Sequence, residues 1–214
     1  MKALPAATAV NRILPKEAFY QRLSLSSELK ARFVADISHI SLANSLTADT
    51  LNIQPGCDVK EILLLVVDLK AQDFEYRIIE RITRQNQHHL VFQLRYEGWE
   101  QFALYCSKLY KTEWQANGEL EFDFSGSFTL DDIWSCFVRQ IALRQEILPN
   151  RQGVEVAELL EKQEHILKLQ RDIDKMEKQT RTEKQPKKKY ALYTEMQTLK
   201  RRLAEEKGEY TWKN

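Results

Sequence analysis

Two apolar stripes at helical spacing, separated by a single proline, constrain the last third of this chain. The first stripe consists of Leu159, Ile166, Leu169, Ile173 and Met176, and the second of Leu192, Met196, Leu199 and Leu203. Pro186 lies between them, and proline cannot occupy the interior of one straight helix. Each half is only about three heptads long, which is too short to be secure alone. An antiparallel helical hairpin, in which the stripes form a shared apolar seam, satisfies both constraints.

The seam and the turn of this hairpin suggest two kinds of ligand. The seam suits a protein partner, and its candidate partner-binding residues are Ile166, Leu169, Ile173, Met176, Leu192, Met196, Leu199 and Leu203. The turn is basic, and its candidate nucleic-acid-binding residues are Arg181, Lys184, Lys187, Lys188 and Lys189. Such a cluster can neutralise DNA phosphates in a salt-dependent way, or it can simply keep an exposed turn hydrated. Both explanations of the basic turn remain open.

The residues before the hairpin alternate between helical and strand patterns. A short helix is expected after Pro15, and a second helix, capped by Ser26 or Ser27, carries an apolar stripe from Leu29 to Leu46. Residues 61–70 are a nearly continuous apolar run, as expected for a central strand. Asp73 can cap a helix that runs to about residue 85, which would cross to the next strand.

Two hairpins and one further helix complete the predicted body. The first hairpin joins residues 89–96 to 100–108, and the second joins 109–115 to 119–125 through Asn117-Gly118. Thr129 and Asp132 have the spacing of a capping box for the last helix of the body. The predicted class is therefore α+β: a mainly antiparallel sheet with one βα crossover and flanking helices in residues 1–150. A helical-hairpin arm with a short tail follows in residues 151–214.

Composition excludes several classes of protein. The 214 residues are 43% hydrophobic, enough for a real core, and the formal net charge of +1 gives no overall preference for polyanions. The three cysteines have no paired spacing, so neither a disulfide framework nor a zinc site is expected. No window has the roughly 18 apolar residues of a membrane span, and the N-terminus lacks a signal-peptide core. We expect a cytoplasmic protein that does not associate with membranes.

One strand end offers a weak candidate for catalysis. Asp68 and Lys70 close the apolar run, and an acid-x-Lys pair at a strand end is half of the metal-dependent nuclease pattern. The acid binds a divalent metal, the lysine steadies the attacked phosphate, and a second acid is required. Asp58 or Glu61 could supply that second acid. Solvation of the strand end explains the same residues, so no metal site is assigned.

Other residues that could carry chemistry do not form a recognisable motif. His88 and His89 are adjacent, so on a strand their side chains point to opposite faces and cannot share a metal ion. The chain has no nucleophile elbow, no Gly-rich phosphate loop and no dinucleotide fingerprint, and no cofactor is expected. These observations favour a binding role over catalysis.

Several stretches of the chain resemble the bacterial family known as domain of unknown function 4391. They are ILPKEAFYQRL, LTADTLNI, EILLLVVDLK, HHLVFQLRY, KTEW and EKQPKKKYALYTEMQTLKRRLAEE. The resemblance extends over essentially the whole chain and brings no catalytic residues with it. Proteins of this family tend to be encoded beside DNA methyltransferases and superfamily-two helicases, in loci that look like restriction or phage-defence systems. The resemblance therefore implies an accessory subunit in DNA-directed defence.

Together, the residues and the resemblance predict a non-enzymatic accessory or adaptor subunit of a restriction-modification-like system. Its expected partner is a larger DNA-acting protein such as a helicase or methyltransferase, and double-stranded DNA is a further candidate ligand of the arm. Two alternatives remain open. One is a metal-dependent nuclease that uses Asp68 and Lys70. The other is a self-associating coiled-coil protein, a homodimer in which the seams of two chains form a four-helix bundle.

Overall fold

The computed structural model describes residues 4–23, 25–144, 147 and 154–208. The chain divides into two compact units, residues 1–142 and residues 143–214. The boundary predicted between residues 150 and 151 falls in a stretch, 148–153, that lies outside the described residues. The predicted tail, residues 209–214, lies outside them as well.

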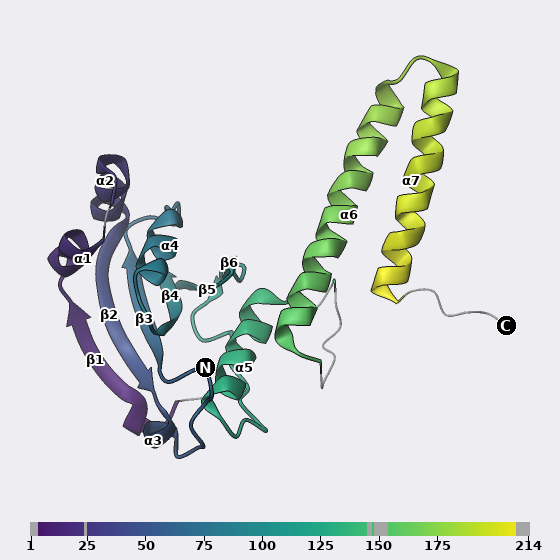
Figure 1. The fold of residues 1–214 in the computed structure, drawn as a ribbon. Coiled ribbons are helices and arrows are strands. Elements are labelled where there is room, and N and C mark those ends of the chain that lie inside the picture. The colour runs from purple at the N-terminus through teal and green to yellow at the C-terminus, as the bar shows by residue number, and fades with distance from the viewer. Residues whose placement is uncertain (1–3, 24, 145–146, 148–153, 209–214) are drawn as a thin grey trace. The chain divides into compact units, whose positions relative to one another are not determined.

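The first unit is built on one mixed β-sheet (Figure 1). Strands β1 to β6 lie in chain order across a seven-stranded sheet, and β7 pairs with β5. The strands are β1 (Ala9–Leu14), β2 (Ile37–Leu46), β3 (Ile62–Leu69), β4 (His89–Tyr96), β5 (Trp99–Cys106), β6 (Lys108–Lys111) and β7 (Gln115–Ala116). β3 and β4 run parallel and are joined through α4 (Arg77–Arg84), whereas the other strand pairs are antiparallel. The predicted α+β class with one βα crossover is confirmed.

Helices α1 (Lys16–Arg22), α2 (Ser27–Asp36) and α4 cover one face of this sheet. Successive strand residues point to opposite faces, so β3 and β4 contribute every second side chain to this layer. Leu65 of β3 and Phe92 of β4 belong to the same buried cluster as Phe33 of α2 and Ile78 of α4. Phe33 and Phe92 have no exposed surface, so the main core of the unit lies here.

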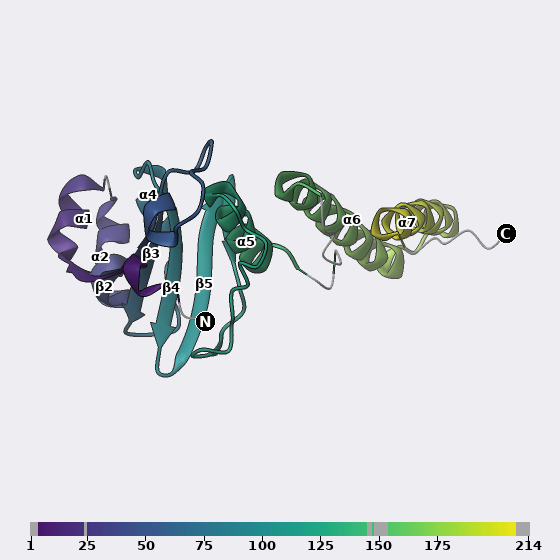
Figure 2. The same ribbon diagram turned by 90° about the horizontal axis from the view of Figure 1, so that it is seen from below.

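Helix α5 (Leu130–Ala142) packs on the opposite face (Figure 2). Phe102 of β5 meets Phe122 edge-on, and Phe122 also packs against Phe137 of α5, with ring centroids 4.9 Å apart in both pairs. The aromatic pairs add directional contacts to the burial of apolar area. Two short helical segments, η1 (Ala6–Thr8) and α3 (Ala48–Leu51), complete this unit.

Strand β1 lies at one edge of the sheet and is exposed over most of its length. Its register with β2 shifts between Ala9 and Arg12, and Asn11 in between adopts a positive φ of 50°. Asparagine tolerates this conformation better than most residues. The extra residue changes the face on which the following side chains lie. Arg12 therefore shares a face with Leu42 of β2.

The predicted second helix is wrong in its second half. Ser26 caps α2 as expected, since its hydroxyl accepts a hydrogen bond from the Leu29 amide at 3.2 Å. The helix ends at Asp36, and the next ten residues form β2. Register shifts in β2 place its buried residues Ile37 and Ile40 three positions apart instead of two or four. The bulges therefore give the buried residues of this strand a spacing that is typical of a helix, which explains the wrong prediction.

Two other predicted elements are corrected. Helix α4 begins at Arg77 and has no side-chain cap, and the Asp73 carboxylate pairs with Arg32 at 3.3 Å. Residues 119–125 form no strand. The short strand before them, β7, pairs with β5 instead of forming the predicted hairpin with these residues. Phe122 is nevertheless buried and Glu121 is exposed, so the alternation correctly identified the inward-facing positions.

The start of α5 agrees with its predicted capping box. The Thr129 hydroxyl accepts a hydrogen bond from the Asp132 amide at 3.2 Å, and the Asp132 carboxylate accepts one from the Thr129 amide at 2.9 Å. The pKa of Asp132 lies below its ordinary value, mainly because the carboxylate accepts a hydrogen bond from the Phe128 amide. The hydrogen bonds from Thr129 lower the pKa further. The box satisfies backbone donors that the first helical turn cannot pair internally.

Asp131, in the first turn of the same helix, fixes the loop before β3. Its carboxylate accepts hydrogen bonds from the backbone N–H groups of Cys57, Asp58 and Val59 at 2.6, 3.3 and 2.8 Å. Desolvation acts to raise its pKa, but the three backbone donors and nearby Lys60 together act more strongly, so the pKa lies below its ordinary value. One ionised side chain therefore joins two segments that are far apart in the sequence.

The second unit contains the predicted helical hairpin, made of α6 (Val156–Thr182) and α7 (Pro186–Lys207) (Figure 1). Pro186 stands at the first helical position of α7, where its missing N–H group costs nothing. Gly208 ends α7 in the left-handed conformation, with a φ of 72°. The hairpin is confirmed.

Candidate functional site

The seam of the hairpin is closed within a single chain. Its buried cluster consists of Ile173, Met176 and Met196, with Leu192, Leu199 and Leu203 partly buried against it. Ile166 is completely buried in a second cluster with Ile147, and Leu169 is 7% exposed. The predicted partner-binding residues therefore pack inside the hairpin. Their role in binding a partner stays a prediction, and a partner of the folded hairpin would meet its outer surfaces.

The turn between α6 and α7 concentrates positive charge at the start of a helix. No side chain caps α7, and its first turn has no acidic residue. Lys187, Lys188 and Lys189 lie in that turn and are exposed. The helix dipole already makes this end positive, which makes lysines unfavourable there without an anion. The Glu183 carboxylate, which accepts a hydrogen bond from the Gln185 N–H at 2.8 Å, is one anion beside this turn. Of the other predicted basic residues, Arg181 pairs with Glu177 on its own helix, at 3.5 Å.

The side of α7 that faces away from the seam has an unusual composition. The residues at spacings of three and four along this side are Lys187, Tyr190, Thr194, Gln197 and Arg201, which we call the α7 outer stripe. All five are exposed, and Tyr190, the aromatic residue of the stripe, is 72% exposed. Tyr193 beside the stripe is 50% exposed. The stripe thus combines aromatic, hydroxyl, amide and cationic groups and contains no acid.

The nuclease candidate Asp68 lies in a row of polar residues on the sheet face that carries α5. The register places His39, Asp68, Arg95 and Glu100 side by side on β2, β3, β4 and β5. Residues paired in this way point to the same face. Glu100 is 2% exposed and accepts hydrogen bonds from the Gln93 amide group at 2.6 Å and the Gly118 N–H at 2.7 Å. The row is a polar patch on the sheet, in which the basic Arg95 lies between the acids Asp68 and Glu100.

The second acid proposed for a nuclease does not reach Asp68. Asp58 and Glu61 precede β3, whereas Asp68 is near its end. At about 3.3 Å per residue along a strand, the Cα atoms of Glu61 and Asp68 are roughly 23 Å apart. The Lys70 ammonium group donates a hydrogen bond to the Val34 carbonyl at 2.9 Å. Within residues 4–144 and 154–208, apart from the few masked positions, no three His, Cys, Asp or Glu side chains are grouped as metal ligands.

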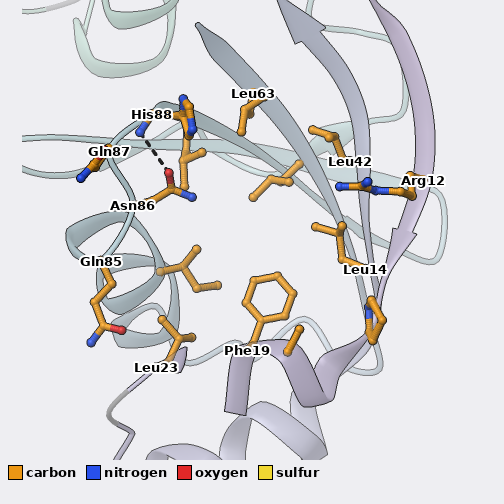
Figure 3. Close-up of a pocket in the computed structure, with 15 residues that line it drawn as sticks. Arg12, Leu14, Phe19, Leu23, Leu42, Leu63, Gln85, Asn86, Gln87 and His88 are labelled. Carbon is orange, nitrogen blue, oxygen red and sulfur yellow. Dashed lines mark hydrogen bonds between the residues drawn. The ribbon is translucent and has the colours of Figure 1, made fainter. Parts of the chain in front are cut away.

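A cavity of about 560 Å³ opens on the opposite face of the sheet, between α1 and α4 (Figure 3). Its floor is apolar and comes from four strands: Leu14 of β1, Leu42 of β2, Leu63 and Leu65 of β3, and Leu90 of β4. Phe19 of α1 and Ile82 of α4 form walls. Leu14, Phe19, Leu42 and Leu63 are only partly buried although they adjoin the core. The cavity is therefore an unfilled apolar basin.

Polar groups stand at the rim of this basin. Arg12 reaches toward it from β1, and Gln85, Asn86, Gln87 and His88 follow α4 on the other side (Figure 3). His88 Nδ1 lies 3.1 Å from a Glu61 carboxylate oxygen, and the other oxygen of Glu61 accepts a hydrogen bond from Ser45. The Arg12 side chain has no hydrogen bond or ion pair with another residue that the structure describes.

The two adjacent histidines face opposite sides of the sheet, as predicted. Whereas His88 pairs with Glu61, the His89 ring packs against Trp134 of α5, with centroids 4.6 Å apart. Burial lowers the pKa of His89 more strongly than the charges of Asp131 and Asp58 raise it, so the ring is mainly neutral at pH 7.

Comparison with known proteins identifies the family of the chain. The model of the family described as domain of unknown function 4391 matches residues 3–203. The chain belongs to this DUF4391 family. The match includes the body of the DUF4391 chain and most of its arm, so the hairpin is part of what defines the family. No curated protein and no solved structure matches the chain.

Sequence reasoning missed the basin of the DUF4391 chain and its rim. Arg12 and His88 are 76 positions apart in the chain, and no local motif connects them. A regular β1 would have placed Arg12 on the other face, so the bulge at Asn11 was needed to find it. None of the described helices has the length and apolarity that a membrane crossing requires.

Proposed function

We propose that this chain is a non-enzymatic accessory subunit of a DNA-directed bacterial defence system. In this role the arm contacts a larger DNA-acting partner, such as a helicase or methyltransferase, and the phosphates of the DNA that the partner holds. Family membership alone does not specify this role. The single observation that carries the proposal is the α7 outer stripe with its basic start.

The composition of the stripe fits phosphate contact. Lys, Arg, Tyr, Thr and Gln are among the side chains that most often bind DNA phosphates, and each of these types occurs in the stripe or beside it. The three lysines of the first turn extend this surface to the N-terminal end of α7, where the dipole favours an anion. The stripe has no acid from Lys187 to Arg201 that would oppose a phosphate.

The same surface is also the better candidate for protein contact. The seam residues are buried between α6 and α7, so binding through them would require the hairpin to open. Tyr190 and Tyr193 are large and exposed, and tyrosine is enriched where proteins meet. We therefore assign the contact with the partner to the outer stripe instead of the seam.

DNA contact can be tested by charge reversal at Lys187, Lys188 and Lys189, all changed to Glu. Duplex affinity should fall, and the slope of log affinity against log salt should become shallower by up to about 3, since each lost phosphate contact removes about 0.9. A matched control reverses Lys168, Arg171 and Lys175, which are exposed on α6, and causes the same change in net charge. Equal losses in the two variants, or none in either, would show that the turn is only a hydrated loop.

Partner contact needs a separate measurement. The intact chain should co-purify from its native host with a DNA-acting protein, and this association should survive nuclease treatment. Changing both Tyr190 and Tyr193 to Ala should abolish it, whereas Glu195→Ala, on another side of α7, should not. A chain that purifies only with copies of itself, as judged by light scattering, would instead support the self-association alternative.

A further inference from the structure

The basin between α1 and α4 plays no part in the proposed function, yet its shape is that of a ligand site. Its volume of about 560 Å³ lies within the range of roughly 300–1,000 Å³ that is typical of small-molecule pockets. Such pockets are mostly apolar and contain a few placed polar groups. Leu42 and Leu63 leave part of their side chains open to this space instead of completing the core.

The lining of the basin shows a clear bias in charge. Among the residues that the structure describes, it contains two ionisable side chains, Arg12 and His88, and no Asp or Glu. His88 already has a carboxylate partner in Glu61, which lies outside the lining. Arg12 has no partner among the described residues, and a guanidinium group stays charged at any relevant pH. In the described part of the chain, the basin therefore offers one cation without a partner above an apolar floor.

The outline of the basin favours a compact ligand over a helix or an extended peptide. In the view of Figure 3, side chains from β1, β2, β3, α1 and the segment after α4 form a ring around the space. A helix-binding groove must instead stay open along several turns, and strand addition uses the free edge of a sheet. The four lining residues of the segment after α4 also carry amide groups or a ring nitrogen that can bond to a bound molecule.

We propose that this basin binds a small amphipathic anion, which buries an apolar body against the leucine floor and places one anionic head group on Arg12. Burial of the body supplies most of the binding free energy, because apolar area leaves water. The head group receives charge-assisted hydrogen bonds from the guanidinium group, which makes the anion preferred over an uncharged molecule of the same shape. The ligand class is thus a medium-chain or aromatic carboxylate or sulfonate.

The test compares decanoate with decanol, which share a chain length and differ in the charge of the head group. Isothermal titration should show saturable binding of decanoate to the full chain, about tenfold tighter than binding of decanol. Arg12→Gln should reduce this preference to about twofold or less. Absence of saturable decanoate binding, or an unchanged preference in Arg12→Gln, would overturn the proposal.

A second pair of variants tests the location. Ala18 lines the basin from α1 and is exposed, so Ala18→Trp should fill the space and abolish binding of both compounds. Glu17→Trp adds the same ring to an exposed neighbour outside the lining and should leave binding intact. If Ala18→Trp does not fold, nuclear Overhauser contacts between bound decanoate and the Leu63 methyl groups of the unaltered chain decide the question. Decanoate that binds Ala18→Trp normally, or that shows no contact with Leu63, would refute this assignment.

Discussion

Truncating Ile173 to Ala should selectively destabilise the arm. Ile173 is 6% exposed and packs with Met176 of its own helix and Met196 of α7. The change removes three carbon atoms, which at about 0.8 kcal/mol each amounts to roughly 2.4 kcal/mol of lost burial. The cavity left between the two helices adds to this, giving about 3 kcal/mol in total. Each helix gains most of its stability from packing its apolar face against the other, so the whole hairpin should respond.

Amide hydrogen exchange measures this loss locally. Protection of α6 and α7 against exchange should fall by roughly 100-fold, because about 1.4 kcal/mol corresponds to a factor of ten in the opening equilibrium. Asp174→Ala is the matched control, since Asp174 is the exposed neighbour of Ile173 on the same helix. Its effect should stay within about 0.5 kcal/mol. Exchange in residues 186–207 that is as slow in Ile173→Ala as in the unaltered chain would refute the view that this seam holds α7 on α6.

Three further predictions concern the attachment of the loop before β3 to α5. Asp131→Ala should lower the free energy of unfolding by about 2 kcal/mol in urea titrations, because it removes an ionised acceptor from three backbone donors. Glu121→Ala, at an exposed position, is the control. An equal or smaller loss in Asp131→Ala than in this control would contradict the prediction. Since the folded-state pKa of Asp131 is lowered, its stabilising contribution is complete above about pH 4 and disappears as the pH falls through the folded-state value. Asp131→Asn should therefore flatten the acid dependence of the urea midpoint, and an unaltered profile would count against the assignment. Gly56→Ala should destabilise the folded body by about 1–3 kcal/mol, because the added Cβ would lie 2.6 Å from the Val59 carbonyl oxygen and 2.7 Å from an Asp131 carboxylate oxygen. An unchanged melting temperature would disprove the clash.

The arm was predictable because its information is local. A repeat at helical spacing identifies the helices, and Pro186 separates them at a position where proline is tolerated. The hairpin of β4 and β5 was equally visible, since strict alternation and Gly98 fix both the strands and the turn between them. In these cases the residues that make contact lie close together in the chain or repeat with a single period.

The candidate sites of the body were less predictable because they depend on register. The alternation of β2 was hidden by its bulges, and without β2 the neighbour of Asp68 on that side, His39, could not be named. The partner of Asp68 on β4, Arg95, depends on the parallel pairing that follows the α4 crossover. Asp131 binds backbone N–H groups more than 70 positions away, and every residue type carries such a group. Side-chain patterns cannot identify a partner of that kind.

The bulge in β1 also affects how the free edge of the sheet resists aggregation. An edge strand presents a line of free N–H and C=O groups onto which a strand of another molecule can add, as happens at the start of aggregation. Ile13 is 69% exposed on this strand and would strengthen such a contact. The left-handed bend at Asn11 breaks the straight line of groups, and Arg12 next to it adds a charge that an incoming strand would have to desolvate. The irregularity that turns Arg12 toward the basin thus also protects the free edge of the sheet.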